Sequence, residues 1–165
     1  IKFAGETLAQ GLPVVLDGIS MGCTTVLLAT ELDLPDQVKA VVADCGFTSA
    51  WEQIKHTIKT NMRLPAFPSL YLVSLFARIF AGIRLRGCDT RKAMEKNTTV
   101  PIFFATGTRD RVVPPEMTKQ NYEACRAPKM LLLTEAAHGM SYLAAKAEYE
   151  KQLEDFLEGC LKQID

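Results

Sequence analysis

The sequence predicts an α/β fold with about four parallel strands flanked by helices. Four apolar runs have the length of a strand, and segments of helical character separate them along the chain. The runs are almost continuously apolar, which is typical of a parallel sheet buried on both faces. About fifty residues lie between the second and third runs, more than a simple crossover needs, so we expect a helical insertion there.

The first predicted strand is the run PVVL at residues 13–16, and the sequence DGISMGCT follows it directly. Here Ser20 stands between Gly18 and Gly22, and residues 23–32 can continue as a helix. A strand, a sharp glycine-flanked turn and a helix are the setting of a nucleophile elbow, in which a strained backbone exposes a serine hydroxyl. An ordinary Gly-Ser loop is the alternative, because G-x-S-x-G alone recurs by chance. The context favours Ser20 as a nucleophile.

The remaining core elements follow in order. The runs at 38–44, 100–107 and 128–136 are the second, third and fourth predicted strands. A helix opens at Pro114–Pro115, since proline suits the first helical turn. A final helix begins near Tyr142. It places these apolar residues at helical spacing: Leu143, Tyr149, Leu153, Phe156, Leu157 and Leu161.

We interpret residues 48–98 as a helical cap inserted into a core made of residues 1–47 and 99–165. The cap holds Trp51, several prolines and an apolar helix at 69–83. That helix carries two apolar stripes, Leu70, Val73, Phe76 and Phe80 on one and Leu72, Leu75 and Ile79 on the other. One stripe can pack on the core while the other lines a pocket. A helix that is buried all round is the alternative.

Composition and charge are those of an ordinary globular domain, since 48% of the 165 residues are hydrophobic and 23% are charged. Nineteen basic residues balance nineteen acidic ones, which gives no indication of a nucleic-acid-binding face. The five cysteines are scattered and form no C-x-x-C pair, so neither a disulfide framework nor a zinc site is predicted. We expect no metal and no cofactor.

Localisation is predicted from the same features. Unpaired cysteines favour a reducing compartment, and the longest apolar region, 69–83, is interrupted by Arg78 and too short to cross a bilayer. The expected location is the cytoplasm. The chain begins at Ile1 without an initiator methionine, in a segment (IKFAGETLAQG) that looks like the end of a helix. We therefore expect the natural N-terminus, with any targeting or anchor segment, to lie upstream.

A serine nucleophile needs a base, usually a histidine that a carboxylate orients. The chain has two histidines. His56 lies in the charged, amphipathic stretch WEQIKHTIK, where we expect a solvated side chain. His138 follows the fourth predicted strand and precedes Gly139. Active sites of open α/β sheets form at the carboxyl ends of the strands, so His138 is the predicted base.

Three aspartates compete as the acid that orients His138. Asp110 follows the third strand in GTRDRVVPP, Asp44 ends the second strand, and Asp17 immediately precedes the elbow. Asp17 is too close to Ser20 along the chain to reach a histidine across the site. The chain order Ser, Asp, His favours Asp110. Asp44 stays its rival.

These motifs resemble the α/β-hydrolase superfamily. The resemblance rests on the motifs GISMG, GTRDRVVP and AAHG, which follow successive predicted strands. A narrower resemblance is to bacterial serine hydrolases of the carboxylesterase and serine-aminopeptidase branches. It rests on ADCGFTS, the proline-rich cap and EACRAPK. The resemblance spans nearly the whole chain and implies a Ser20–His138–Asp110 triad that works through an acyl-enzyme. Cys23 is a mild departure, because the superfamily usually has a small residue there.

The resemblance also implies an oxyanion hole formed by the backbone N–H of Met21 and a second N–H from a loop after an earlier strand. That earlier strand would lie upstream of Ile1, so the chain resembles the C-terminal portion of a larger hydrolase. We expect the isolated piece to be inactive. We also expect its first strand to be covered, either by the missing N-terminal part or by a second copy.

The predicted function is hydrolysis of carboxylic esters of small acyl substrates. A peptidase or amidase of the same fold is the first alternative, since the sequence does not distinguish ester from amide substrates. A non-catalytic α/β-hydrolase-fold interaction domain is the second. A third is a lipase at a membrane surface, with the cap helix as the interfacial element.

Overall fold

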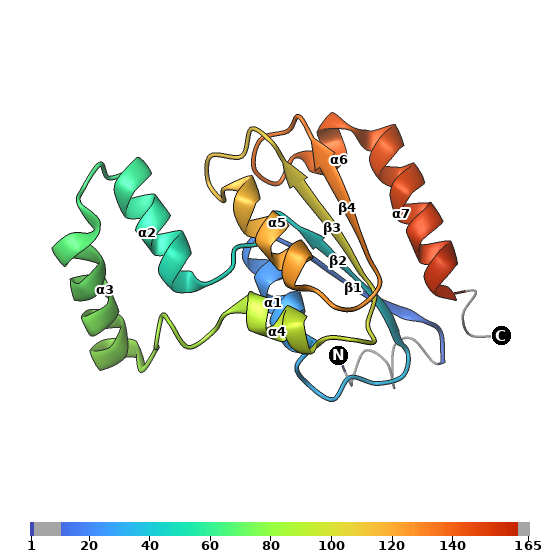
Figure 1. Cartoon of the computed structure of the whole chain (residues 1–165), viewed down its shortest axis with the longest axis horizontal. Coiled ribbons are helices and arrows are strands. Elements are labelled where there is room, and N and C mark those ends of the chain that lie inside the picture. The colour runs from blue at the N-terminus through green and yellow to red at the C-terminus, as the bar shows by residue number, and fades with distance from the viewer. Residues whose placement is uncertain (2–10, 162–165) are drawn as a thin grey trace.

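The computed structural model describes residues 1 and 11–161, which fold around a four-stranded parallel sheet with helices on both faces (Figure 1). In chain order the elements are β1 (Val14–Ile19), α1 (Met21–Ala29), β2 (Val38–Asp44), α2 (Ala50–Thr60), α3 (Ala66–Ala81), α4 (Thr90–Lys96), β3 (Ile102–Gly107), α5 (Pro115–Ala124), β4 (Lys129–Thr134), α6 (Ser141–Ala144) and α7 (Lys146–Leu161). The helix end expected at residues 1–11 lies almost wholly outside the described residues.

The strands lie in the sheet in the same order as in the chain, β1-β2-β3-β4, and every neighbouring pair is parallel. Ile19 pairs with Asp44, and Asp44 pairs with Ala105. All four carboxyl ends therefore meet at one edge of the sheet. The predicted α/β class is confirmed.

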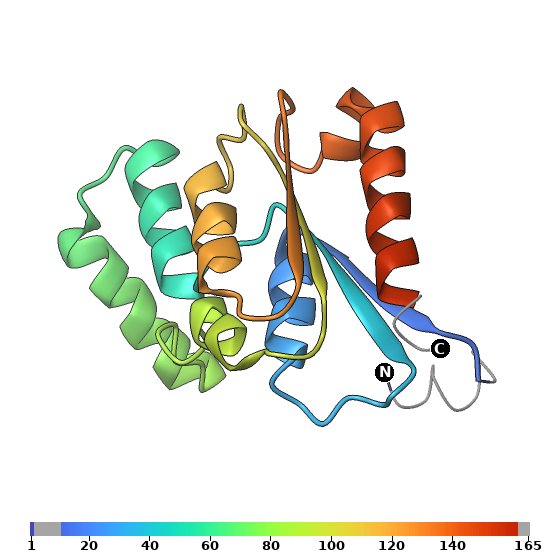
Figure 2. The same cartoon turned by 45° about the vertical axis from the view of Figure 1, so that its right-hand side comes forward.

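Helices α1, α4 and α5 lie on one side of the sheet, and α7 with the short α6 lies on the other (Figure 2). Phe103 and Phe104 are adjacent in β3 and fully buried, so they point to opposite faces. Phe104 belongs to the core under α1, α4 and α5, whereas Phe103 packs against Tyr149 and Phe156 of α7. Both faces of the two middle strands are thus covered, as their apolar sequences predict.

β1 is longer than predicted, and one of its faces is exposed. It extends through Ile19 instead of ending near residue 16, because Asp17, Gly18 and Ile19 continue the pairing with β2. Within the described residues β1 has one neighbouring strand. Leu16 and Gly18 are buried on one face, but Val15 and Ile19 are exposed on the other. α7 packs on β2, β3 and β4, and it leaves Val15 and Ile19 of β1 exposed.

The segment between β2 and β3 contains three helices with different surroundings. α4 packs against α1 and α5, and its Ala93 and Met94 are fully buried in the core. α2 lies beyond α5, and α3 is the outermost helix in both views (Figures 1 and 2). α3 corresponds to the apolar helix predicted at 69–83, but Leu70 is its only buried residue. The alternative of a helix buried all round is wrong.

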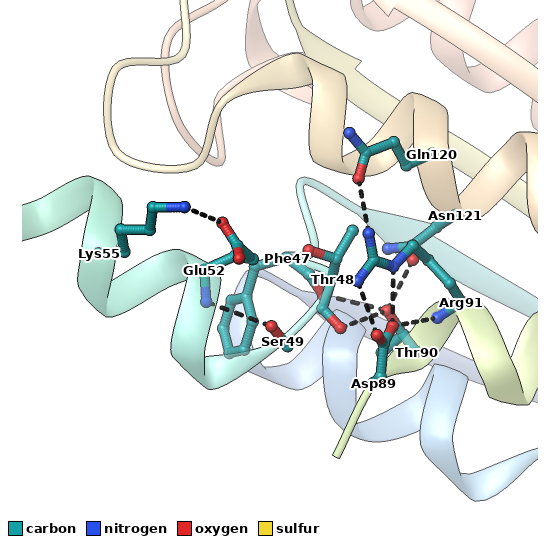
Figure 3. A network of polar contacts seen from close by, with 10 residues as sticks. All are labelled: Phe47, Thr48, Ser49, Glu52, Lys55, Asp89, Thr90, Arg91, Gln120 and Asn121. Atoms are coloured by element: carbon teal, nitrogen blue, oxygen red, sulfur yellow. Dashed lines mark hydrogen bonds and ion pairs between the residues drawn. The ribbon is translucent and has the colours of Figure 1, made fainter. Parts of the chain in front are cut away.

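The α2–α3 segment, residues 50–88, leaves and rejoins the body at one place (Figure 3). Ser49 and Asp89 form an antiparallel bridge there. The Thr90 N–H donates to the Thr48 carbonyl at 2.9 Å, and the Thr90 hydroxyl donates to Asn121 Oδ1 at 2.6 Å. We call these paired ends, Thr48–Ser49 and Asp89–Thr90, the neck. They fasten both ends of the segment to α5 and to each other.

The final helix is interrupted, although a continuous one is predicted from about Tyr142. Ala145 has φ −134° and ψ 42°, which separates α6 from α7. Tyr149 and Phe156 face the core as expected, but Leu143 is exposed. Among the helices of residues 11–161, none is long and apolar enough to span a membrane.

Candidate active site

The turn between β1 and α1 has the geometry of an elbow. Ser20 has φ 56° and ψ −115°, a left-handed conformation that is strained for a residue with a side chain. A Cβ on Gly18 would lie 2.4 Å from the Gly22 carbonyl oxygen, so only glycine fits at position 18. A Cβ on Gly22 would meet no heavy atom within 4 Å. The close approach therefore depends on the first glycine of the motif.

The Ser20 hydroxyl does not cap the helix that it precedes. A serine at this N-cap position usually accepts a hydrogen bond from a backbone N–H of the first turn. Here there is no such cap bond, and Ser20 Oγ lies instead 2.9 Å from His138 Nε2. The strained turn thus directs the hydroxyl toward the imidazole.

Asp110 lies on the other side of His138. The Asp110 Oδ2 atom is 2.7 Å from His138 Nδ1. A carboxylate can only accept, so Nδ1–H donates to Asp110 and Nε2 is left to accept the Ser20 proton. The side chain of Asp110 is fully buried, and that of His138 is 23% exposed. Ser20, His138 and Asp110, hereafter the triplet, form one continuous series of hydrogen bonds.

Backbone groups fix the Asp110 carboxylate. Its Oδ1 atom accepts from the N–H groups of Val112 at 2.8 Å and Val113 at 2.9 Å. Both oxygens therefore have partners, which a buried carboxylate requires. The loop after β3 holds the acid in one orientation toward the imidazole.

Asp44, the rival acid, contacts a different residue. Its Oδ1 atom accepts from the Ser141 hydroxyl at 3.2 Å, and both residues are buried. Burial raises the pKa of Asp44 above its usual value. Ser141 begins α6, three residues after His138. Asp44 therefore ties the end of β2 to the segment that carries the histidine.

α2 contacts the loop that carries Asp110, and no sequence pattern predicts this contact. His56 Nε2–H donates to the Arg111 carbonyl at 3.2 Å, and the Gln53 amide donates to the Val112 carbonyl at 2.8 Å. His56 lies outside the triplet, and Asp17 is exposed on β1. Alternating polar residues on an amphipathic helix are the only available signal, and they do not identify a partner.

Met21, the predicted oxyanion donor, is the first residue of α1. The first four N–H groups of a helix have no partner within it, and they lie at the positive end of the helix dipole. The Met21 N–H directly follows Ser20 in the chain, as the predicted role requires.

Cys45 is the feature near the triplet that the sequence analysis missed. Its Sγ atom and ligand atoms of Asp110 and His138 lie within 4.8 Å of one another, the one such group found in residues 11–161. Burial raises the pKa of Cys45 to about 12, so the thiol is neutral near pH 7, whereas a metal requires a thiolate. Asp110 and His138 already bind each other. We therefore assign these donors to the triplet and its surroundings.

A groove of about 400 Å³ lies between the bare face of β1 and α7. Val15, Ile19, Tyr149 and Leu153 line it, together with Gly139 next to His138. It therefore runs from the uncovered strand toward the carboxyl edge of the sheet.

Known proteins resemble this chain in sequence over most of its length. Residues 15–144 match the family described as serine hydrolase (FSH1). The uncharacterized protein YqkD of Bacillus subtilis (strain 168) is 31% identical over 154 residues, which are 93% of this chain and 50% of YqkD. The chain thus spans half the length of this curated relative.

Two solved structures share the fold at lower identity. The esterase Pf2001 of Pyrococcus furiosus superposes with a TM-score of 0.69 at 20% identity, over 97% of this chain and 58% of the esterase. The acylaminoacyl peptidase of Pyrococcus horikoshii gives 0.59 at 17% identity, over 88% of this chain and 23% of the peptidase. Their likeness to this chain is one of fold.

Proposed function

Because this chain belongs to the serine hydrolase (FSH1) family, an α/β-hydrolase family, we propose that it carries the catalytic centre of an esterase for small acyl substrates. The observation that carries the proposal is the continuous hydrogen bonding from Ser20 through His138 to Asp110. A nucleophile, a base and an orienting acid in this arrangement are the requirements for acyl transfer by serine.

The first half of the proposed reaction forms an acyl-enzyme. Ser20 Oγ attacks the ester carbonyl while its proton moves to His138 Nε2. Asp110 stabilises the imidazolium through the Nδ1–H bond, and the Met21 N–H donates to the oxyanion. His138 then gives the proton to the departing alkoxide, and an alcohol leaves.

The second half regenerates the serine. His138 removes a proton from water, and the hydroxide adds to the acyl carbonyl. The C–O bond to Ser20 breaks, and the serine oxygen recovers its proton from His138. The products are the carboxylic acid and the free enzyme. Ser20 lies between the exposed apolar residues Ile19 and Met21, and these surroundings suit an acyl group.

Peptidase or amidase activity is the second candidate, since the same triplet can cleave amides. The shared fold with an acylaminoacyl peptidase favours it. An amide has a poorer leaving group than an ester, so its cleavage depends more strongly on proton donation by His138. A p-nitrophenyl ester and a p-nitroanilide of the same acyl group separate them in the longer protein that contains this chain: we expect turnover of the ester to exceed that of the anilide, and the reverse order would establish the amidase.

Labelling with a fluorophosphonate tests the proposal independently of the substrate. Ser20 Oγ attacks phosphorus, fluoride leaves, and a P–O bond marks the serine. We expect labelling at Ser20, found by peptide mass analysis, and its loss in Ser20→Ala. Ser74→Ala on α3 is the matched control and keeps full labelling. The labelling is done on the longer protein that contains this chain, and a folded but unlabelled longer protein would favour the non-catalytic interaction domain.

A further inference from the structure

The apolar face of α3 points into solvent. Leu72, Leu75, Phe76, Ile79 and Phe80 recur at the spacing of a single helix face. Their exposed fractions run from 49% to 80%. Phe76 and Phe80 stack on each other with centroids 5.8 Å apart, and Val73 on the same side is also exposed. In a water-soluble helix such a face normally packs against a core, but no part of residues 11–161 covers this one.

The segment that carries this face is basic, although Glu52 at its start pairs with Lys55. Residues 53–88 contain six basic side chains and no acidic one, in a chain whose net charge is zero. Lys59, Arg63, Arg78 and Arg84 are exposed. Within residues 11–161 these four make no ion pair with an acidic side chain. An apolar face thus stands among uncompensated cations.

We propose that α3 docks on the surface of an anionic lipid bilayer. An amphipathic helix with a large apolar face and flanking Lys and Arg lies in the membrane interface, with its apolar side in the acyl boundary and its cations at the headgroups. Sixteen residues are fewer than the roughly 20 needed to cross the hydrocarbon layer, so the helix lies along the surface.

The charge pattern favours lipid over a second copy of this chain. A symmetric dimer through α3 would place the same patch of each copy against the other. The four exposed cations named above would then approach the same four of the other copy, and residues 53–88 contain no acidic side chain to neutralise them. Anionic headgroups neutralise the cations while the acyl layer buries the phenylalanines, so one surface satisfies both features.

Docking would also connect the lipid surface with the loop that carries Asp110. α2 packs against α3 and is hydrogen-bonded to the loop that carries Asp110. A surface that holds α3 therefore holds a neighbour of the catalytic carboxylate. The docking itself needs no catalysis, so Ser20→Ala is expected to bind as the wild type does. This separates the inference from the proposed function.

Co-sedimentation with vesicles tests the proposal. The probes are phosphatidylcholine alone and phosphatidylcholine mixed with phosphatidylglycerol, each at low and high salt. We expect binding to the mixed vesicles that weakens with salt. Trp51, the only tryptophan, packs against Tyr71 of α3 at 5.5 Å and gives a second readout through its emission.

Substitutions on each part of the surface have matched controls. Phe76→Gln/Phe80→Gln should weaken binding at least about tenfold, because apolar burial drives insertion. Arg78→Gln and Arg84→Gln should each weaken binding to anionic vesicles about fivefold and leave neutral ones unaffected. Leu32→Gln/Leu143→Gln removes exposed apolar side chains elsewhere, and Arg126→Gln removes an exposed arginine elsewhere. Both controls should bind as the wild type does.

Two results would overturn the proposal. One is a folded chain that binds neither vesicle, or that binds both equally and regardless of Arg78 and Arg84. The other is concentration-dependent dimerisation that Phe76→Gln/Phe80→Gln abolishes, which would assign the face to a second copy. Circular dichroism shows for each variant that the fold is kept.

Discussion

At the scale of single residues, the two glycines of the elbow motif have different tasks. Gly18 lies against the Gly22 carbonyl, so Gly18→Ala forces the backbone apart. We expect it to lower the free energy of unfolding by about 1–3 kcal/mol. Gly22 has open space around it and lies in α1, where alanine loses less entropy. Gly22→Ala should therefore raise stability by up to about 1 kcal/mol. Urea denaturation of both variants compares them directly, and equal destabilisation would refute the assignment.

Asp110 and Asp44 are a second pair that the structure separates. Asp110→Asn should lower kcat by about four orders of magnitude, as amide replacement of a triad acid does in a serine protease. Asp44→Asn keeps an oxygen acceptor for Ser141, so a loss below about tenfold is expected. Both variants are made in the longer protein that contains this chain, and rates on a p-nitrophenyl ester and rates of fluorophosphonate labelling measure both. A severe Asp44→Asn with a mild Asp110→Asn would reverse the roles.

The stability of the fold depends on the ionisation of the buried Asp44 carboxyl group. Burial raises the pKa of Asp44, so the folded state disfavours its ionised form and stability falls as the pH rises through the raised pKa. Asp44→Asn should then leave the chain at least as stable as wild type at neutral pH. At a pH below both pKa values the advantage should disappear in urea denaturation. A variant that is less stable at every pH would mean that the ionised carboxylate is needed for folding.

The candidate site could be predicted in part. Ser20, His138 and Asp110 each follow a strand, and a parallel sheet gathers those strand ends at one edge, so their proximity follows from topology. The bond between Asp44 and Ser141 joins residues 97 positions apart. Its partners depend on how α6 packs, and no local pattern encodes that. The same holds for Cys45, whose place beside Asp110 and His138 comes from the end of β2.

At the scale of elements, the N-terminus of α4 depends on Asp89. Its Oδ1 atom accepts from the Arg91 N–H at 3.1 Å, and Arg91 Nη2 donates to Oδ2 at 2.7 Å. Removing an N-cap carboxylate typically costs about 1 kcal/mol, so Asp89→Ala should destabilise the chain by that amount at neutral pH. Thermal or urea unfolding measures it.

The pH dependence of this effect has a definite sign. The hydrogen bond from Arg91 lowers the pKa of Asp89. The stabilisation is therefore present above the unfolded pKa of about 4 and is lost as the pH falls through the lower folded pKa. Asp89→Asn is the control, because asparagine caps a helix but does not titrate. A deficit of Asp89→Ala that stays constant down to strongly acidic pH would contradict the role of the charge.

The predicted elements differ from the observed ones where neighbours decide the outcome. β1 continues through Asp17 and Gly18, a polar and a flexible residue, because β2 offers backbone partners for both. The break at Ala145 lies within a continuous apolar periodicity, and this pattern by itself predicts one uninterrupted helix. α3 has the pattern of a helix that faces a core, yet its apolar face is exposed. Periodicity identifies a face and not what covers it.

At the scale of the whole molecule, we propose that the free edge of β1 pairs with another strand, from a longer protein or from a second copy. The edge has unpaired backbone groups, and Val15 and Ile19 beside the groove are exposed. Such an edge is a template for strand addition. We expect sedimentation velocity to show self-association of the chain that rises with concentration.

Substitution on this face tests the pairing. Val15→Lys puts a charge on the bare face, a known means of blocking edges, and should reduce association. Leu32→Lys, an exposed leucine away from the sheet edge, is the control and should change nothing. A chain that sediments as a monomer at every concentration would refute the proposal.

The neck has a consequence for how such molecules diversify. Ser49 and Asp89 lie side by side, so the chain between them can be shortened, lengthened or exchanged without altering the distance that its ends must span. Loop length adds little to the cost of closure. The triplet and the sheet lie outside this segment, although Gln53 and His56 of α2 bond to the loop that carries Asp110. A lineage can therefore keep one chemistry and acquire new surfaces by replacing residues 50–88 as a cassette that keeps these two contacts, and a protein engineer can graft a foreign helical hairpin there on the same condition.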